Sequence, residues 1–145
     1  MRAWKSALLC AVLLCACRPF LLLPGGKLDG PVKPTPASFA LPGNRDTIQL
    51  ETRPEDPYSV NISGAVVDGN LYVSAGDTLT GWAKNVEANP LVRARVEGNV
   101  YELRARRVTD RAELQAFSVV WLSGNTFSRY PMTLGEVWAY QLGPR

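Results

Sequence analysis

Hydroxyl side chains gather at the start of one predicted helix, between Ser74 and Lys84. Ser74 lies near the end of an apolar strand pattern, and Thr78 and Thr80 precede a run with one apolar face at helical spacing. Hydroxyl groups and the backbone N–H groups of a helix N-terminus bind anions, and Lys84 adds a positive charge one turn into the helix. These residues predict a phosphate cradle. In the alternative interpretation, Thr78 or Thr80 caps the helix and Lys84 is solvated.

Two further groups of side chains are suited to ligand binding. Trp82, on the same predicted helix, is large and flat enough to stack on a planar ring, although core or dimer-interface packing is the commoner use of such a residue. Five arginines can bind an anionic ligand, a lipid headgroup or a polysaccharide: Arg93, Arg95, Arg104, Arg106 and Arg107. They also fit a solvated outer face that Glu97 and Glu102 partly neutralise.

The composition excludes much chemistry. The 145 residues include no histidine, so this chain has no Ser-His-Asp triad, no Cys-His dyad and no histidine-ligated metal. Carboxylates at a recognisable catalytic spacing and metal-ligand clusters are also missing, and we predict no catalytic or metal-binding residue. A formal net charge of +3 is too small for a general nucleic-acid-binding protein. Any catalysis would therefore depend on a borrowed cofactor.

The first 17 residues have the pattern of an export signal. Arg2 and Lys5 precede an apolar run of eleven residues, which suits a signal peptide and is too short to span a membrane. The run ends in Leu14-Cys15-Ala16-Cys17, which resembles a bacterial lipobox. The resemblance implies cleavage before Cys17 and its lipidation, which would anchor the exported protein to a membrane of the bacterial cell envelope. A signal cut elsewhere and an uncleaved anchor extended through Phe20–Leu23 are the alternatives.

All three cysteines lie in this segment, so the expected mature domain has no disulfide and no thiolate nucleophile. Residues 18–43 follow as a tether and lead-in, and six of the eleven prolines lie between Pro19 and Pro42. Such a composition predicts an extended spacer. Phe39 and Leu41 are apolar, and we expect them to pack along the domain surface.

Residues 44–145 form the predicted folded domain, because strand patterns and hairpin signals dominate there. The expected strands are Asp46–Thr52, Tyr58–Val67 with a bulge at Gly64, Asn70–Ala75, Leu91–Glu97, Asn99–Val108 and Leu134–Leu142. The expected helices run from Thr78 or Thr80 to Ala88, and from Arg111 to about Trp121, with Asp110 as N-cap. Hairpin connections favour antiparallel pairing, so the fold class is mainly β, a small six-stranded antiparallel barrel with two short helices.

One hairpin register follows from its turn. A two-residue turn of Gly98 and Asn99 predicts Arg95 opposite Glu102 and Arg93 opposite Arg104. Alternation then puts the apolar residues of both strands on one face and the charged residues on the other.

The order of these elements resembles the flavin-binding split β-barrels, namely the pyridoxamine 5'-phosphate oxidase-like proteins and the deazaflavin-dependent nitroreductases. The resemblance covers roughly residues 45–145 and depends on Trp82 and Asn85 before Ala88-Asn89-Pro90, on the hairpin that follows, and on the closing strand. It implies a homodimer with FMN or a deazaflavin coenzyme in a groove between two barrels, and an oxidoreductase activity. The positions that correspond to cofactor contacts are Ser74, Thr78, Thr80, Trp82, Lys84 and Asn85.

The chain departs from that pattern at the cofactor phosphate. Ser74 keeps a hydroxyl but has no basic neighbour, and Asn61-Ile62-Ser63-Gly64 replaces a segment with arginine and lysine. Hydroxyls and a helix N-terminus can hold an anion without a fixed cation. The alternative function is a non-catalytic barrel that binds a ligand or partner in the same groove after losing the phosphate site.

Overall fold

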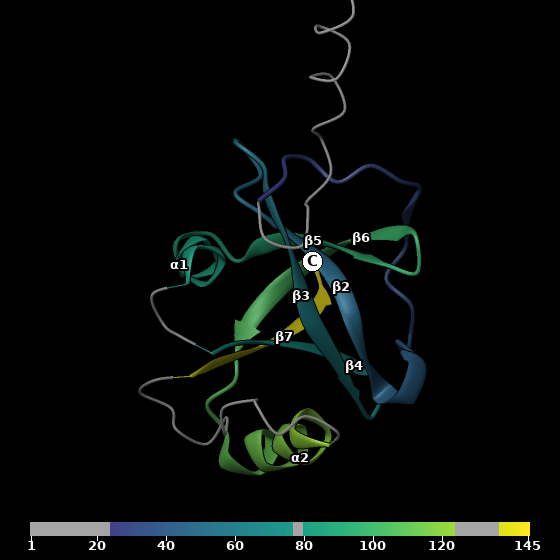
Figure 1. Ribbon diagram of the computed structural model, residues 1–145, viewed down its shortest axis with the longest axis vertical. Helices are drawn as coiled ribbons and strands as arrows, with labels where there is room; N and C mark the ends of the chain where they lie inside the picture. Colours follow the sequence, from purple (N-terminus) through teal and green to yellow (C-terminus); the bar gives the residue numbers. More distant parts are fainter. Residues whose placement is uncertain (1–23, 77–79, 124–136) are drawn as a thin grey trace, which may run out of the picture.

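The computed structural model describes residues 24–76, 80–123 and 137–145 of the chain. These residues form seven strands, two α-helices and one short 3-10 helix (Figure 1). The strands are β1 (Val32–Lys33), β2 (Arg45–Thr52), β3 (Tyr58–Val67), β4 (Asn70–Ala75), β5 (Leu91–Val96), β6 (Asn99–Arg107) and β7 (Trp138–Pro144). The helices are η1 (Pro42–Asn44), α1 (Gly81–Ala88) and α2 (Arg111–Leu122).

Six of the strands close into a barrel, which confirms the predicted fold class. The order is β6-β5-β2-β3-β4-β7, every pairing in it is antiparallel, and β7 pairs back onto β6. The short strand β1 pairs in parallel with the first residues of β6, and β7 pairs with the last ones. The edge of β6 is therefore shared between β1 and β7.

Alternation along the strands separates an inner core from an outer wall. The inner cluster holds aliphatic residues such as Ile48, Leu50 and Val73, together with Trp82 and Val86 of α1, so α1 packs against the barrel interior. The outer cluster lies under α2 and contains Ala65, Tyr72, Val108, Leu114, Phe117, Trp121 and Ala139. The two helices thus pack on different sides of the sheet: α1 joins the inner core, and α2 covers the outside of β3, β4 and β7.

The N-terminus of α2 forms as its sequence predicts. Asp110 is the N-cap, and its Oδ1 accepts a hydrogen bond of 2.8 Å from the backbone N–H of Glu113. Leu114, Phe117 and Trp121 are buried along one side of the helix. The predicted amphipathic helix is confirmed.

The register of the β5–β6 hairpin differs from the predicted one. The turn residues are Glu97 and Gly98, with φ angles of 48° and 84°, and Arg93 lies opposite Glu102. A two-residue hairpin turn with positive φ at both positions favours glycine at the second position, which places Gly98 there. The shift moves every pair by two residues, so the apolar face of Val92, Ala94 and Val96 still points into the core.

Gly64 makes no bulge. The ladders of β3 with β2 and with β4 run without interruption through this residue. A Cβ atom on Gly64 would lie 3.1 Å from Cδ1 of Ile48, so the missing side chain leaves room for a buried isoleucine.

The lead-in packs on the barrel and is no spacer from Pro24 onward. Leu28, Phe39 and Leu41 are buried, and the backbone N–H of Phe39 donates to the carbonyl of Gly69. The burial of Phe39 and Leu41 confirms the sequence prediction for these two residues. The composition predicts an extended tether because proline stiffens a chain locally and glycine loosens it, and neither residue type reports tertiary contacts.

Candidate functional site

Polar side chains line the outer wall of β2, β3 and β4 beside α2. Ser74 lies two residues beyond Tyr72 on β4, and Ser63 two residues before Ala65 on β3, so both share the outer face with the cluster under α2. Gln49 of β2 pairs with Asn61 of β3. We call Gln49, Asn61, Ser63 and Ser74 the outer strip.

Two atoms of the outer strip are buried without a hydrogen-bond partner among the described residues. They are Oγ of Ser74 and Oε1 of Gln49. The amide nitrogen of Gln49 is satisfied, because it donates to Oδ1 of Asn61 at 3.0 Å. Buried polar atoms in native proteins nearly always have partners, so the strip presents a hydroxyl and an amide oxygen that are ready for a ligand.

A recess of about 380 Å³ adjoins the strip, and a cation lies in its wall. Its lining is Pro42, Gly43, Arg45, Asp46, Thr47, Ser63 and Ser123. The guanidinium of Arg45 lies 4.4 Å from the centre of the Trp121 ring and donates to the Trp121 carbonyl near the end of α2. Burial lowers the pKa of Arg45 from its ordinary value, although an arginine remains charged. Arg45 was not among the predicted site residues, because it lies one residue before the predicted strand Asp46–Thr52.

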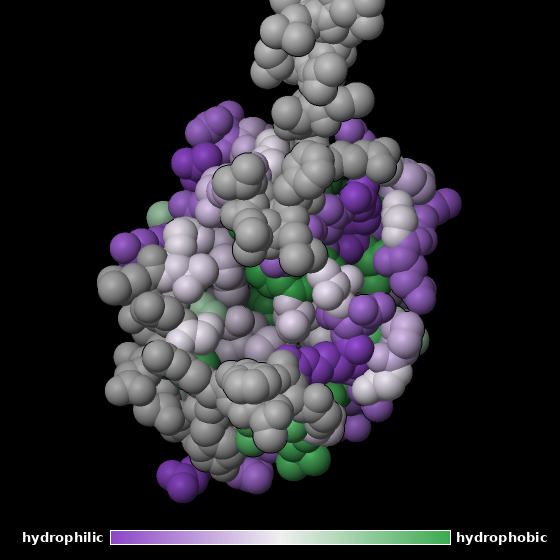
Figure 2. Space-filling view, viewed as in Figure 1, coloured by the Kyte–Doolittle hydropathy of each residue, from purple (hydrophilic) through white to green (hydrophobic). Residues whose placement is uncertain are grey.

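The space-filling view shows one face of the molecule. Among the coloured residues, hydrophilic ones surround a hollow near the middle that has hydrophobic residues at its bottom (Figure 2).

The residues predicted on α1 lie apart from Ser74. Trp82 is 4% exposed, and its ring meets that of Tyr140 edge-on at 5.7 Å. This is core packing, the alternative to the stacking role on a ligand ring. Lys84 is exposed, and Asn85 donates to Oγ1 of Thr52 at 3.0 Å. Thr80 is the N-cap residue of α1 but makes no side-chain capping hydrogen bond.

Two predicted residues lie outside the described ones, namely Thr78 and Cys17. The start of α1 nevertheless adjoins β3, because a Cβ atom on Gly81 would lie 3.4 Å from the Tyr58 hydroxyl. The structure therefore places Ser74 on one wall of the barrel with Gln49, Asn61 and Ser63, and leaves the α1 residues apart from them.

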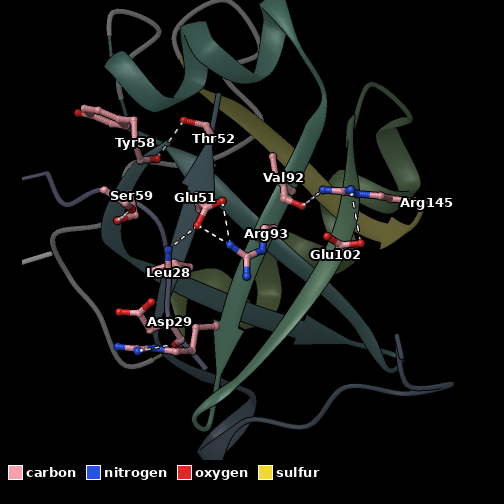
Figure 3. Close-up of polar contacts among 12 residues, drawn as sticks. Leu28, Asp29, Glu51, Thr52, Tyr58, Ser59, Val92, Arg93, Glu102 and Arg145 are labelled. Atoms are coloured by element: carbon pink, nitrogen blue, oxygen red, sulfur yellow. Dashed lines mark hydrogen bonds and ion pairs between the residues drawn. The ribbon is translucent and has the colours of Figure 1, made fainter. Parts of the chain in front are cut away.

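A buried carboxylate lies on the outer wall farther along β2 (Figure 3). Glu51 is 4% exposed and accepts hydrogen bonds of 3.0 and 3.2 Å from Nη1 of Arg93, which lies opposite it on β5. The backbone N–H of Leu28 donates to the same carboxylate at 2.5 Å. The Glu51 carboxylate thus accepts hydrogen bonds from both Arg93 and the Leu28 backbone, so this cluster holds the lead-in on the barrel.

Most of the five predicted arginines contact their own chain. Arg93 pairs with Glu51, Arg95 donates to the Asp29 carbonyl, and Arg106 donates to Glu113. Arg107 lies over the Trp138 ring at 4.3 Å, and Arg104 is exposed. This arrangement favours the structural interpretation of the arginines over an anion-binding patch.

The described residues offer no metal centre and no candidate membrane helix. No group of three or more histidine, cysteine, aspartate or glutamate side chains in them is placed to hold a metal ion. None of the described helices is long and apolar enough to cross a membrane.

Comparison with solved structures identifies the fold. A conserved hypothetical protein of Mycobacterium tuberculosis matches at 21% identity with a TM-score of 0.52, over 68% of this chain and 72% of that one. A putative 5-nitroimidazole antibiotic resistance protein of Bacteroides thetaiotaomicron matches at 12% identity with a TM-score of 0.51, over 69% and 73%. A pyridoxamine 5'-phosphate oxidase-related, FMN-binding protein of Nostoc punctiforme matches at 14% identity with a TM-score of 0.48, over 70% and 71%.

No protein-family model matches the chain, and no curated protein sequence matches it. The identities lie below 25%, so the structural matches show the fold alone. The two matches with TM-scores above 0.5, together with the closed antiparallel order of six strands, show that the chain shares the barrel fold of those two proteins.

Proposed function

We propose that this chain is a lipoprotein of the bacterial cell envelope whose barrel binds FMN or a deazaflavin coenzyme on its outer wall and acts as an oxidoreductase. The observation that carries the binding part is the outer strip, where Oγ of Ser74 and Oε1 of Gln49 are buried without partners among the described residues. Ser74 is also a position at which the family resemblance implies a cofactor contact. Lipidation at Cys17 rests on the lipobox-like segment.

The residues of the strip fit such a cofactor. The hydroxyls of Ser63 and Ser74 can donate hydrogen bonds to phosphate oxygens, and Arg45 contributes a positive charge in the adjoining recess. Oε1 of Gln49 can accept a hydrogen bond from a ring N–H group. A bound flavin or deazaflavin would supply the hydride or electron transfer, because this redox chemistry belongs to the cofactor ring.

Purified full-length protein in detergent gives the first test. We expect a flavin or deazaflavin absorbance band in the preparation, or quenching of cofactor fluorescence when FMN or the deazaflavin coenzyme is titrated at micromolar concentration. A preparation without a chromophore that quenches neither cofactor would contradict the oxidoreductase proposal.

The lipid anchor is tested separately. We expect Cys17→Ser to move the protein from the membrane fraction to the soluble fraction, and Cys10→Ser, in the same signal, to leave it on the membrane. Retention of the Cys17→Ser protein on membranes would contradict lipidation at this cysteine.

A non-catalytic ligand-binding barrel is the second candidate. The observation in its favour is that Arg45 already contacts the carbonyl and the ring of Trp121, while Lys84 is exposed on α1. The cofactor phosphate would then have no dedicated cation among the described residues of the strip. Absence of cofactor binding, together with specific binding of another small molecule that Ser74→Ala weakens, would support this candidate.

A further inference from the structure

Residues 25–33 run across the outer wall of the barrel and are fastened there by hydrogen bonds. We call these residues the strap. The N–H of Gly25 donates to the Ser59 carbonyl at 2.8 Å, and the N–H of Ser59 donates back to the Gly25 carbonyl at 2.9 Å. The Ser59 hydroxyl donates to the Gly26 carbonyl at 2.6 Å. The strap therefore begins as an added piece of sheet beside β3.

Glu51 fixes the middle of the strap (Figure 3). Its carboxylate accepts the backbone N–H of Leu28 at 2.5 Å, and Arg93 holds the same carboxylate from the other side. Leu28 is 2% exposed and Glu51 is 4% exposed. A buried carboxylate that loses a partner costs folding free energy, so the contact with Arg93 and the contact with Leu28 stabilise each other.

The far end of the strap is held by the β5–β6 hairpin. Nη1 of Arg95 donates to the Asp29 carbonyl at 3.1 Å, and the N–H of Val100 donates to the Pro31 carbonyl at 2.9 Å. Val32 and Lys33 then pair with Val100 and Tyr101 as β1. The strap thus contacts β3, β2, β5 and β6 in turn.

We propose that the strap is a latch, locked by Glu51, that holds the barrel close to its lipid anchor. The inference rests on the proposed lipidation of Cys17. Eight residue steps separate Cys17 from Gly25, and at about 3.5 Å a step they reach about 28 Å. If residues 25–33 left the barrel, the 17 steps to Pro34 would reach about 60 Å. The strap therefore keeps the outer wall near the membrane surface.

The sequence provides a direct probe of the latch. Between residues 6 and 44, Lys27 is the one lysine or arginine that a proline does not follow, since Arg18 and Lys33 both precede prolines. Trypsin must therefore cut this stretch at the Lys27–Leu28 bond, whose N–H is the group bonded to Glu51. Cleavage there requires the strap to open, and it separates the barrel from Cys17.

The experiment uses the full chain on isolated membranes. We expect Lys27 to resist trypsin in the natural protein, and Glu51→Gln to raise the rate of barrel release about ten-fold or more, because a neutral amide binds the Leu28 N–H and Arg93 less strongly. Leu28→Ala changes the strap and leaves the barrel walls intact, and it should also raise the rate at which trypsin releases the barrel. Glu102→Gln is the matched control, since Glu102 is an exposed carboxylate that pairs with Arg145 at 3.6 Å.

Circular dichroism of each variant shows that the barrel is folded. The inference is overturned if trypsin cuts Lys27 in the natural protein as fast as in an unfolded peptide of the same sequence, or if Glu51→Gln and Leu28→Ala release the barrel no faster than Glu102→Gln. The anchor is scored before trypsin is added, by the fraction of protein on the membrane. Failure of lipidation and failure of the latch therefore give different results.

Discussion

Among single residues, Ser74 is the one that points most directly to ligand binding. Its hydroxyl is buried on the outer wall without a partner in the described structure. An unpaired buried hydroxyl costs about 1–3 kcal/mol of folding free energy. A residue that lowers stability in this way fits a site where a ligand supplies the missing hydrogen bond.

We predict that Ser74→Ala raises the stability of the cofactor-free protein by about 1 kcal/mol, because alanine removes the unpaired hydroxyl. Thermal unfolding followed by circular dichroism measures the change. Ser118→Ala is the control, since its buried hydroxyl donates to the Leu114 carbonyl at 2.6 Å, and we expect no gain there. A loss of stability in Ser74→Ala as large as that in Ser118→Ala would show that Ser74 has a partner.

The buried ion pair of Glu51 and Arg93 contributes to the stability of the fold. Glu51→Ala leaves Arg93 without its carboxylate in a mostly buried place, and we expect a loss of roughly 3 kcal/mol in the free energy of unfolding by urea. Glu102→Ala removes an exposed partner and should cost less than about 1 kcal/mol. Equal losses in the two variants would contradict the structural role of Glu51.

The sequence predicted the site only in part at the level of residues. Ser74 was found through the strand pattern and the family resemblance, whereas Gln49, Arg45 and Glu51 were not. Their roles depend on cross-strand neighbours such as Asn61 and Arg93, far away in the chain. Trp82 was recognised as a large aromatic residue, but its spacing fits a core position as well as a ligand contact.

Among the elements, each α-helix is attached to the barrel by a hydrogen bond from a strand tyrosine to a helix glutamate. The Tyr72 hydroxyl donates to Glu113 of α2 at 3.0 Å, and Arg106 donates to the same carboxylate at 2.6 Å. The Tyr140 hydroxyl donates to Glu87 of α1 at 2.7 Å. These contacts fix the helices that flank the outer strip and the barrel end.

The Tyr72 network predicts a loss of stability in alkali. Burial first, and then the hydrogen bond and the charge of Glu113, raise the pKa of Tyr72 to about 12, against 10 in an exposed tyrosine. The native state therefore holds this proton more tightly than the unfolded state does. Its contribution is fully present below pH 10 and is lost as the pH rises through 12.

Urea unfolding at several pH values measures this effect. We expect Tyr72→Phe to flatten the fall in stability between pH 10 and 12. Part of the slope remains in that variant, because burial and Glu87 also raise the pKa of Tyr140. An unchanged slope in Tyr72→Phe would contradict the network.

Most element boundaries could be predicted from the sequence, because hydrophobic alternation and capping residues act locally. Strands β3 and β4 begin and end as predicted, and Asp110 caps α2. The β5–β6 register could not be fixed in the same way. Either Glu97-Gly98 or Gly98-Asn99 makes a plausible turn by composition, and only the positive φ of both Glu97 and Gly98 decides between them.

At the scale of the whole molecule, the barrel is closed by β7 pairing with β6, joined by α1 and crossed on the outside by the strap. Antiparallel hairpins in the sequence predicted the barrel. The docked lead-in was missed because its contacts, such as Leu28 to Glu51, join residues 23 positions apart and follow no local pattern.

The family resemblance implies a homodimer, which is a prediction for the whole molecule. Light scattering of the purified protein in mild detergent, corrected for bound detergent, should give twice the mass of one chain. A monomer at micromolar concentration would remove the groove between two barrels, and a single outer wall would then have to hold the cofactor alone.

Cofactor binding by three proteins in one titration tests the proposed site on the outer strip. FMN and the deazaflavin coenzyme are each added to the natural protein, Ser74→Ala and Ser118→Ala, and the quenching of cofactor fluorescence is measured. We predict that the natural protein and Ser118→Ala bind one of the cofactors with equal affinity, and that Ser74→Ala binds it about ten-fold more weakly through loss of one hydrogen bond. Equal binding by all three proteins, or no binding by the natural one, would contradict a cofactor site on the outer strip.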